Sequence, residues 1–147
     1  MRRLGLNNIM REKYSLNFTI PFDFKYLSSI DEKIKKFFSI LNINSSVEET
    51  LIFNINLALT EAIVNAIKHG ESDKKHEKIR VIMEFDGNNI TINVHSKGKP
   101  FDIHNITKPD PLSDSGRGLY VISNMMDKID LQNIDGENIL IMKKNVD

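Results

Sequence analysis

The stretch from Leu51 to Gly70 constrains the fold of this chain more than any other. Glu61, Asn65 and His69 recur every four residues, so on a helix they share one stripe. A neighbouring stripe of apolar residues recurs at spacings of three and four: Leu51, Ile55, Leu59, Ala62 and Ala66. The pattern predicts a long helix that ends at Gly70, with a carboxylate and a carboxamide one turn apart beside its apolar face. The stretch alone fits a core helix with a polar edge equally well.

Composition limits the classes of protein to consider. The chain has 147 residues with 40% hydrophobic content, which suits one domain with its own core. Twenty basic residues balance twenty acidic ones, which disfavours nucleic acid or an anionic membrane as the partner. There is no cysteine, and the four histidines lack metal-ligand spacing, so we expect neither disulfides nor a histidine-based metal site. We also expect no bilayer-spanning stretch and a cytoplasmic location.

The other periodicities predict one α+β domain over residues 14–145, preceded by a flexible N-terminal segment over residues 1–13. Ser46 followed by Glu49 is a capping-box pattern for the start of the long helix. Strands are expected over residues 14–20, 78–85, 90–94, 129–131 and 139–142. Helices are expected over residues 27–41, from Ser46 to the break at Gly70, and in a short segment opened by residues 116–118. This order fits a two-layer sandwich in which three helices cover one face of a mostly antiparallel, mixed sheet.

Residues 96–115 contain three of the four prolines and are expected to form a long loop, of the kind that acts as a lid or binding element. Within it, Gly98 suits a tight turn or a close ligand approach, although a plain surface loop explains that segment better. Just after the loop, Gly116 to Leu119 precede an amphipathic helix, where backbone N–H groups attract anions and Arg117 adds a charge. A helix start that needs only flexible residues explains that segment equally well.

Two side chains of the long helix suit specific chemistry. The Asn65 carboxamide oxygen is a hard ligand of the kind that magnesium accepts beside phosphates and water. The Glu61 carboxylate could orient or deprotonate a hydroxyl.

Taken in order, these segments resemble the motifs of the GHKL ATPase superfamily, which has the Bergerat ATP-binding fold. The closest resemblance is to the anti-sigma-factor serine/threonine protein kinases of bacterial partner switching. The family's N box, Glu-x-x-x-Asn-Ala followed by His-Gly, is matched by residues 61–70. Its second glycine box, Gly-Arg-Gly-Leu with a later Met-Asp, is matched by residues 116–119 and 126–127. The resemblance covers nearly the whole chain from Tyr14 onward.

This resemblance implies an ATP- and Mg²⁺-dependent kinase that phosphorylates a serine on a partner protein. The implied partners are a sigma factor, an anti-anti-sigma antagonist, or both, and the implied assembly is a homodimer built through the N-terminal strand. Glu61 would activate the serine hydroxyl and Asn65 would hold magnesium. The other implied nucleotide contacts are His69, Ser96, Gly98, Phe101, Gly116, Arg117, Gly118 and Leu119.

The first glycine box departs from the family pattern Asp-x-Gly-x-Gly-Phe-Asp. Ser96 stands at the first Asp, which in the family accepts a hydrogen bond from the adenine amino group, and Pro100 stands at the second Gly. Losing such a charge-assisted bond costs about 1.5–3 kcal/mol, or about ten- to a hundredfold in affinity. The family's threonine beside the adenine is also missing, since Glu137 and Asn138 follow Gly136; candidates for a compensating contact are His95 and Asp102.

These departures keep an alternative open: a degenerate binding module that sequesters a protein partner with weak or no use of ATP. A third interpretation is an unrelated α+β enzyme in which Glu61 and a histidine perform acid–base work; only the residue types favour it.

Overall fold

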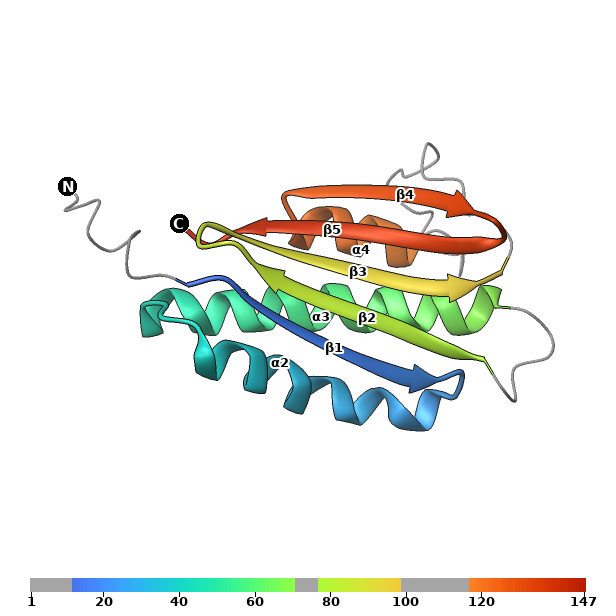
Figure 1. Ribbon diagram of the computed structural model, residues 1–147, viewed down its shortest axis with the longest axis horizontal. Helices are drawn as coiled ribbons and strands as arrows, with labels where there is room; N and C mark the ends of the chain where they lie inside the picture. The colour runs from blue at the N-terminus through green and yellow to red at the C-terminus, as the bar shows by residue number, and fades with distance from the viewer. Residues whose placement is uncertain (1–11, 71–76, 99–116) are drawn as a thin grey trace.

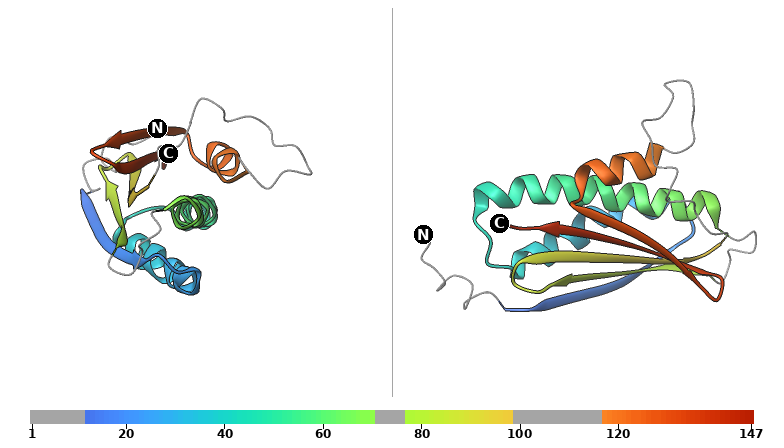
Figure 2. Two further views of the ribbon diagram at one scale, coloured as in Figure 1. Left: turned by 90° about the vertical axis from the view of Figure 1, so that its right-hand side faces the viewer. Right: turned by 90° about the horizontal axis from the view of Figure 1, so that it is seen from above.

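The protein consists of one sheet and a layer of helices. Side chains along β2 and β3 alternate between buried and more exposed positions, because one face of the sheet meets the helices. The computed structural model describes residues 12–70, 77–98 and 117–147. The sheet runs in the order β1-β2-β3-β5-β4, and in the end-on view the helices lie together on one side of it (Figure 2). The elements are β1 (Tyr14–Pro21), a 3-10 helix η1 (Phe24–Ser29), α2 (Ile30–Ile40), α3 (Ser45–His69), β2 (Lys78–Phe85), β3 (Asn89–Lys97), α4 (Arg117–Met125), β4 (Lys128–Ile134) and β5 (Glu137–Asn145).

The expected α+β sandwich with three helices on one face is confirmed (Figure 1). All four strand pairings among the described strands are antiparallel, so the sheet is not mixed. Paired residues of neighbouring strands share a face, so the register identifies the side chains that meet the helices. On β2, β3 and β5 these are buried: Ile79, Val81, Met83, Phe85, Ile90, Ile92, Val94, Leu140 and Met142.

The central helix of the layer is α3, which contacts both α2 and α4. Its predicted apolar stripe is confirmed, because every member is buried: Leu51, Ile55, Leu59, Ala62 and Ala66. The expectation that no stretch could span a bilayer was wrong by the criteria of length and composition, since α3 meets both. Core helices of other proteins meet the same criteria, and the buried side chains of α3 pack into the core cluster.

Several predicted boundaries need correction. The first helix, expected over residues 27–41, is divided into η1 and α2. The long helix is capped by Asn44 instead of Ser46: Asn44 Oδ1 accepts a 2.9 Å bond from the Ser46 N–H. β3 continues through Lys97, so Ser96 belongs to a strand and not to the expected loop. The rest of that loop, and the flexible segment expected over residues 1–13, lie mostly outside the described residues.

Candidate functional site

The first turn of α4 lies directly against the side chain of Asn65. A Cβ atom added to Gly118 would lie 2.4 Å from Asn65 Nδ2 and 2.7 Å from Oδ1. Only glycine allows so close an approach of the backbone. The helix start predicted from the second glycine box therefore meets the α3 stripe that carries the N box.

A second contact joins the end of α3 to the end of β3. Gly70 and Gly98 form an isolated antiparallel bridge, and a Cβ added to Gly98 would lie 2.6 Å from the His69 carbonyl oxygen. The Gly98 N–H also donates to the Gly136 carbonyl oxygen at 3.4 Å, which brings the β4–β5 turn to the same place. The three glycine-containing motifs of the sequence thus converge at one end of α3.

Glu61 lies one helical turn before Asn65 on the same stripe of α3. Both residues are half-buried, while Ala62 and Ala66 beside them are buried in the core. The carboxylate and the carboxamide therefore lie at the edge of the buried stripe, about 6 Å apart along the helix axis, where neither is withdrawn from solvent.

The sheet beside this junction carries two buried polar side chains. Ser96 on β3 is 4% exposed and Asn138 on β5 is 2% exposed, and they are the buried polar residues of the described chain. They are direct partners in the β3–β5 register and lie on the helix-covered face. Asn133 Nδ2 donates a 3.0 Å hydrogen bond to Asn138 Oδ1. The sequence analysis did not assign Asn138 a role, because only strand pairing places it opposite Ser96.

The comparison with known families agrees with this arrangement. The profile described as histidine kinase-like ATPase domain matches residues 30–144. This chain belongs to that family. The predicted resemblance is therefore confirmed at the family level, and the ATPase domain fills most of the chain.

Several similar proteins are serine-protein kinases named RsbW. The serine-protein kinase RsbW of Bacillus thuringiensis is 29% identical over 102 residues, which cover 63% of each chain. RsbW of Oceanobacillus iheyensis is 28% identical over 102 residues, covering 63% of this chain and 65% of that one. The alignments thus span less than two thirds of these relatives.

Two solved structures share the fold. The RsbU and RsbW domains of a Mycobacterium tuberculosis protein superpose with a TM-score of 0.66 at 15% identity, covering 89% of this chain and 32% of that one. The catalytic domain of the histidine kinase ThkA gives a TM-score of 0.51 at 15% identity, covering 90% of this chain and 95% of that one. At this identity the likeness concerns the fold of the ATPase domain alone.

One candidate for a compensating base contact is wrong. His95 lies on the face of the sheet opposite the helices, because its neighbour Ser96 faces inward. There its Nδ1 lies 3.4 Å from Glu137 Oε1 and 3.4 Å from Arg80 Nη2. The imidazole therefore cannot reach the side of the sheet on which α3 and Asn65 lie.

The other predicted site residues are placed as follows. His69 is exposed at the last position of α3, and Leu119 is half-buried against the core. Arg117 begins α4, but its side chain is outside the described part of the structure, as are Pro100, Phe101, Asp102 and Gly116.

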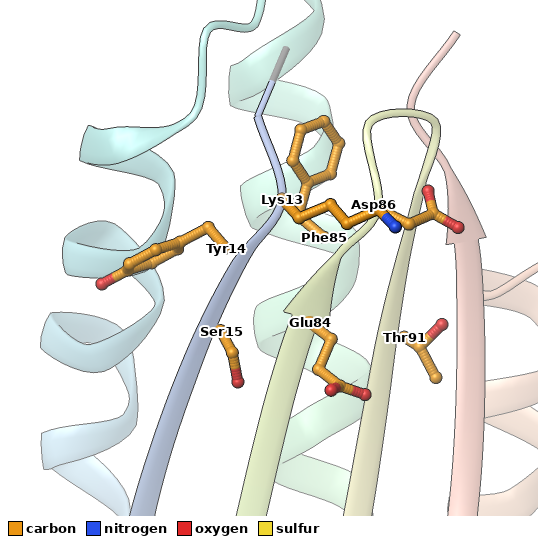
Figure 3. A pocket seen from close by; sticks show the side chains of 7 residues that line it. All are labelled: Lys13, Tyr14, Ser15, Glu84, Phe85, Asp86 and Thr91. Carbon is orange, nitrogen blue, oxygen red and sulfur yellow. The ribbon is translucent and has the colours of Figure 1, made fainter.

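Two further hollows lie away from the N box. A cavity of about 400 Å³ lies at the opposite end of the sheet from Gly98, where Ser15, Glu84 and Thr91 project from adjacent strands (Figure 3). Its other lining residues are Lys13, Tyr14, Phe85 and Asp86. Another hollow, of about 450 Å³, lies between α2 and α3, with Phe53 and Asp31 in its lining. Neither is lined by a predicted site residue.

Proposed function

We propose that this ATPase domain binds Mg-ATP and transfers phosphate to a serine on a partner protein, as an anti-sigma-type serine/threonine kinase. The observation that carries the proposal is the contact of Asn65 with Gly118, which joins the N box to the second glycine box. The likeness to RsbW serine-protein kinases supports the reaction class.

The residues present fit ATP and its cation. Gly118 has no Cβ, so the backbone at the start of α4 lies directly against the Asn65 carboxamide. Backbone N–H groups at a helix start favour phosphate. In the described ranges no three His, Asp or Glu side chains gather into a metal-sized cluster. A magnesium ion at Asn65 would therefore take its other ligands from phosphate and water, as magnesium commonly does.

The chain's own groups have separate roles in this proposal. When bound, Mg-ATP supplies the transferable phosphoryl group with part of its charge neutralised. Asn65 orients that group from α3, and the N–H groups at the start of α4 hold its anionic oxygens. Glu61 accepts the proton of the partner's serine hydroxyl. Catalysis is then mainly positioning and charge stabilisation.

The test is transfer of labelled phosphate from ATP to a cognate antagonist protein. Glu61→Ala should reduce the transfer rate at least a hundredfold, since general-base catalysis contributes about 10²–10⁴-fold. Glu84→Ala, an exposed glutamate on β2, is the matched control and should leave the rate unchanged. Full transfer by Glu61→Ala would rule out this role, and no transfer by the wild type would rule out the kinase.

A second candidate function is a binding module that sequesters its partner without efficient phosphate transfer. The buried, neutral Ser96 favours it, because the family's charged contact to adenine is absent. Thermal melting with Mg-ATP separates the two: ligand at a hundred times its dissociation constant stabilises by about 2.7 kcal/mol. A shift that Asn65→Ala abolishes and Asn54→Ala, on the same helix, preserves supports the nucleotide site. An unchanged melting temperature at millimolar ATP supports the module.

The remaining assignments rest on the same resemblance. We propose a cytoplasmic protein whose partners are a sigma factor, an anti-anti-sigma antagonist, or both. We further propose a homodimer through β1, an edge strand whose outer backbone groups are available for pairing. Light scattering coupled to gel filtration tests the dimer, and a monomer at all concentrations would contradict it.

A further inference from the structure

The glycine that follows α3 is not required by its own backbone conformation. Gly70 has φ of −73° and ψ of 171°, an extended conformation that any residue can adopt, and not the left-handed one for which helix ends commonly use glycine. A Cβ atom added to Gly70 would lie 2.5 Å from Phe22 Cε1, 3.0 Å from Phe22 Cδ1 and 3.0 Å from the Ala66 carbonyl oxygen. The ring of Phe22 therefore packs directly on the Gly70 backbone, and this packing excludes a side chain there.

Phe22 is held in place by the turn that carries it. Pro21 ends β1, and the Asp23 N–H donates to the Pro21 carbonyl oxygen at 2.8 Å, so Phe22 lies at the centre of a tight turn. Asp23 Oδ1 accepts a bond from the Lys25 N–H at 3.0 Å, which fixes the start of η1. The Phe22 side chain is half-buried against the core cluster. Because β1 and α3 end at the same end of the molecule (Figure 1), this turn brings the ring to Gly70.

Gly70 also contacts the end of β3. Gly70 and Gly98 form an antiparallel bridge, and a Cβ added to Gly98 would lie 3.3 Å from the Gly70 Cα and 2.6 Å from the His69 carbonyl oxygen. The Gly98 N–H donates to the Gly136 carbonyl oxygen at 3.4 Å. Because the two bridged glycines have no side chains that could adjust, a shift of Gly70 displaces Gly98 as well. The position of the Phe22 ring thus sets the position of Gly98.

We infer that Phe22 is a positioning residue for nucleotide binding, which acts by holding Gly70 against Gly98. This inference rests on the proposed function, because Gly98 is one of the nucleotide contacts that the family resemblance implies. Glu61 and Asn65 lie within α3, at least one turn before its last residue, so the intact helix keeps them in place. Loss of the Phe22 ring should therefore weaken nucleotide binding, since the site is less preorganised. Phosphate transfer at saturating Mg-ATP should remain nearly unchanged.

The test measures the dissociation constant of Mg-ATP by calorimetry and the rate of phosphate transfer at saturating Mg-ATP. Phe22→Ala should weaken binding about tenfold and change the saturated rate less than about threefold. Gly70→Ala should weaken binding by a similar factor, because its Cβ meets the Phe22 ring. In the double variant the Cβ occupies space that the ring has left, so binding should be about as weak as in either single variant. Phe24→Ala, at an exposed phenylalanine of η1, is the matched control and should keep the wild-type affinity.

Wild-type affinity in Phe22→Ala overturns the inference and leaves the kinase proposal standing, even if the variant melts at a lower temperature, since packing alone then explains the ring. Effects that multiply in the double variant also overturn it, because Phe22 and Gly70 would then act independently. If Phe22→Ala does not fold, Gly70→Ala decides alone, because the extended backbone at Gly70 accepts alanine. Wild-type affinity in that variant overturns the inference, and a loss of about tenfold supports it. Absence of Mg-ATP binding by the wild type overturns the proposed function and the inference together.

Discussion

Gly118, at the start of α4, lies closest to the side chain of Asn65. Alanine at position 118 would place its Cβ 2.4 Å from Asn65 Nδ2, so the amide must move. Such overpacking costs about 1–3 kcal/mol. We predict that Gly118→Ala lowers the melting temperature and also loses the stabilisation by Mg-ATP.

Gly87→Ala is the matched control for this prediction. Gly87 lies in the β2–β3 turn, at the opposite end of the sheet from Gly98, and has φ of +103°, so alanine there costs about 1–2 kcal/mol in backbone strain. We expect a similar fall in stability, with the Mg-ATP shift kept. If Mg-ATP raises the melting temperature of Gly118→Ala as much as that of the wild type, nucleotide binding does not depend on the position of the Asn65 amide beside Gly118.

Asp86, in the β2–β3 turn, makes a contribution to folding stability that depends on pH. The backbone N–H of Asn89 at 2.7 Å, and then that of Asn88 at 2.9 Å, lower the pKa of the Asp86 carboxyl. Because the folded pKa is depressed, the stabilisation is complete above the ordinary pKa of about 3.9 and is lost as the pH falls through the lower folded pKa.

We therefore predict that Asp86→Asn is less stable than the wild type at pH 7, by about 0.5–1 kcal/mol after allowance for solvent screening of this exposed group. The free energies of unfolding in urea should converge as the pH falls toward 2, because the protonated carboxyl resembles the amide. A difference that persists unchanged at low pH would mean that charge is not its cause.

At the scale of elements, the start of α3 depends on Asn44. Its Oδ1 accepts bonds from the Ser46 N–H at 2.9 Å and from the Ser46 hydroxyl at 2.8 Å. We predict that Asn44→Ala destabilises the protein by about 1 kcal/mol, as loss of a helix cap does. Ser46→Ala should cost less, and urea denaturation measures both. The opposite ranking would favour the capping box predicted from Ser46 and Glu49.

At the scale of the whole molecule, α3 connects every part of the core, since it packs on the sheet between α2 and α4. We propose that residues 14–145 form a single cooperative domain. Tyr14, Tyr26 and Tyr120 lie on β1, η1 and α4, and the chain has no tryptophan. Tyrosine fluorescence therefore reports three separate elements. We predict that it and far-ultraviolet circular dichroism give coincident unfolding transitions; two separated midpoints would divide the domain.

The sequence by itself determined that Glu61 and Asn65 share one edge of α3. Residues four apart on a helix share a stripe whatever surrounds them, so the relation of Glu61 to Asn65 follows from local geometry. The turns are equally local: Asp135 and Gly136 have positive φ, as the Asp-Gly turn signal predicts. The contact of the second glycine box with the N box was predicted through the family resemblance, and the residues themselves left it open.

Only the tertiary structure decided which face of the sheet carries each polar side chain of β3 and β5. Side chains alternate between the faces of a strand, so a shift of one residue in register exchanges the two faces. Pairing of β3 with β5 turns Ser96 and Asn138 toward the helices and His95 away from them. Register depends on strands far apart in the sequence, so no local pattern could identify Asn138 as the neighbour of Ser96.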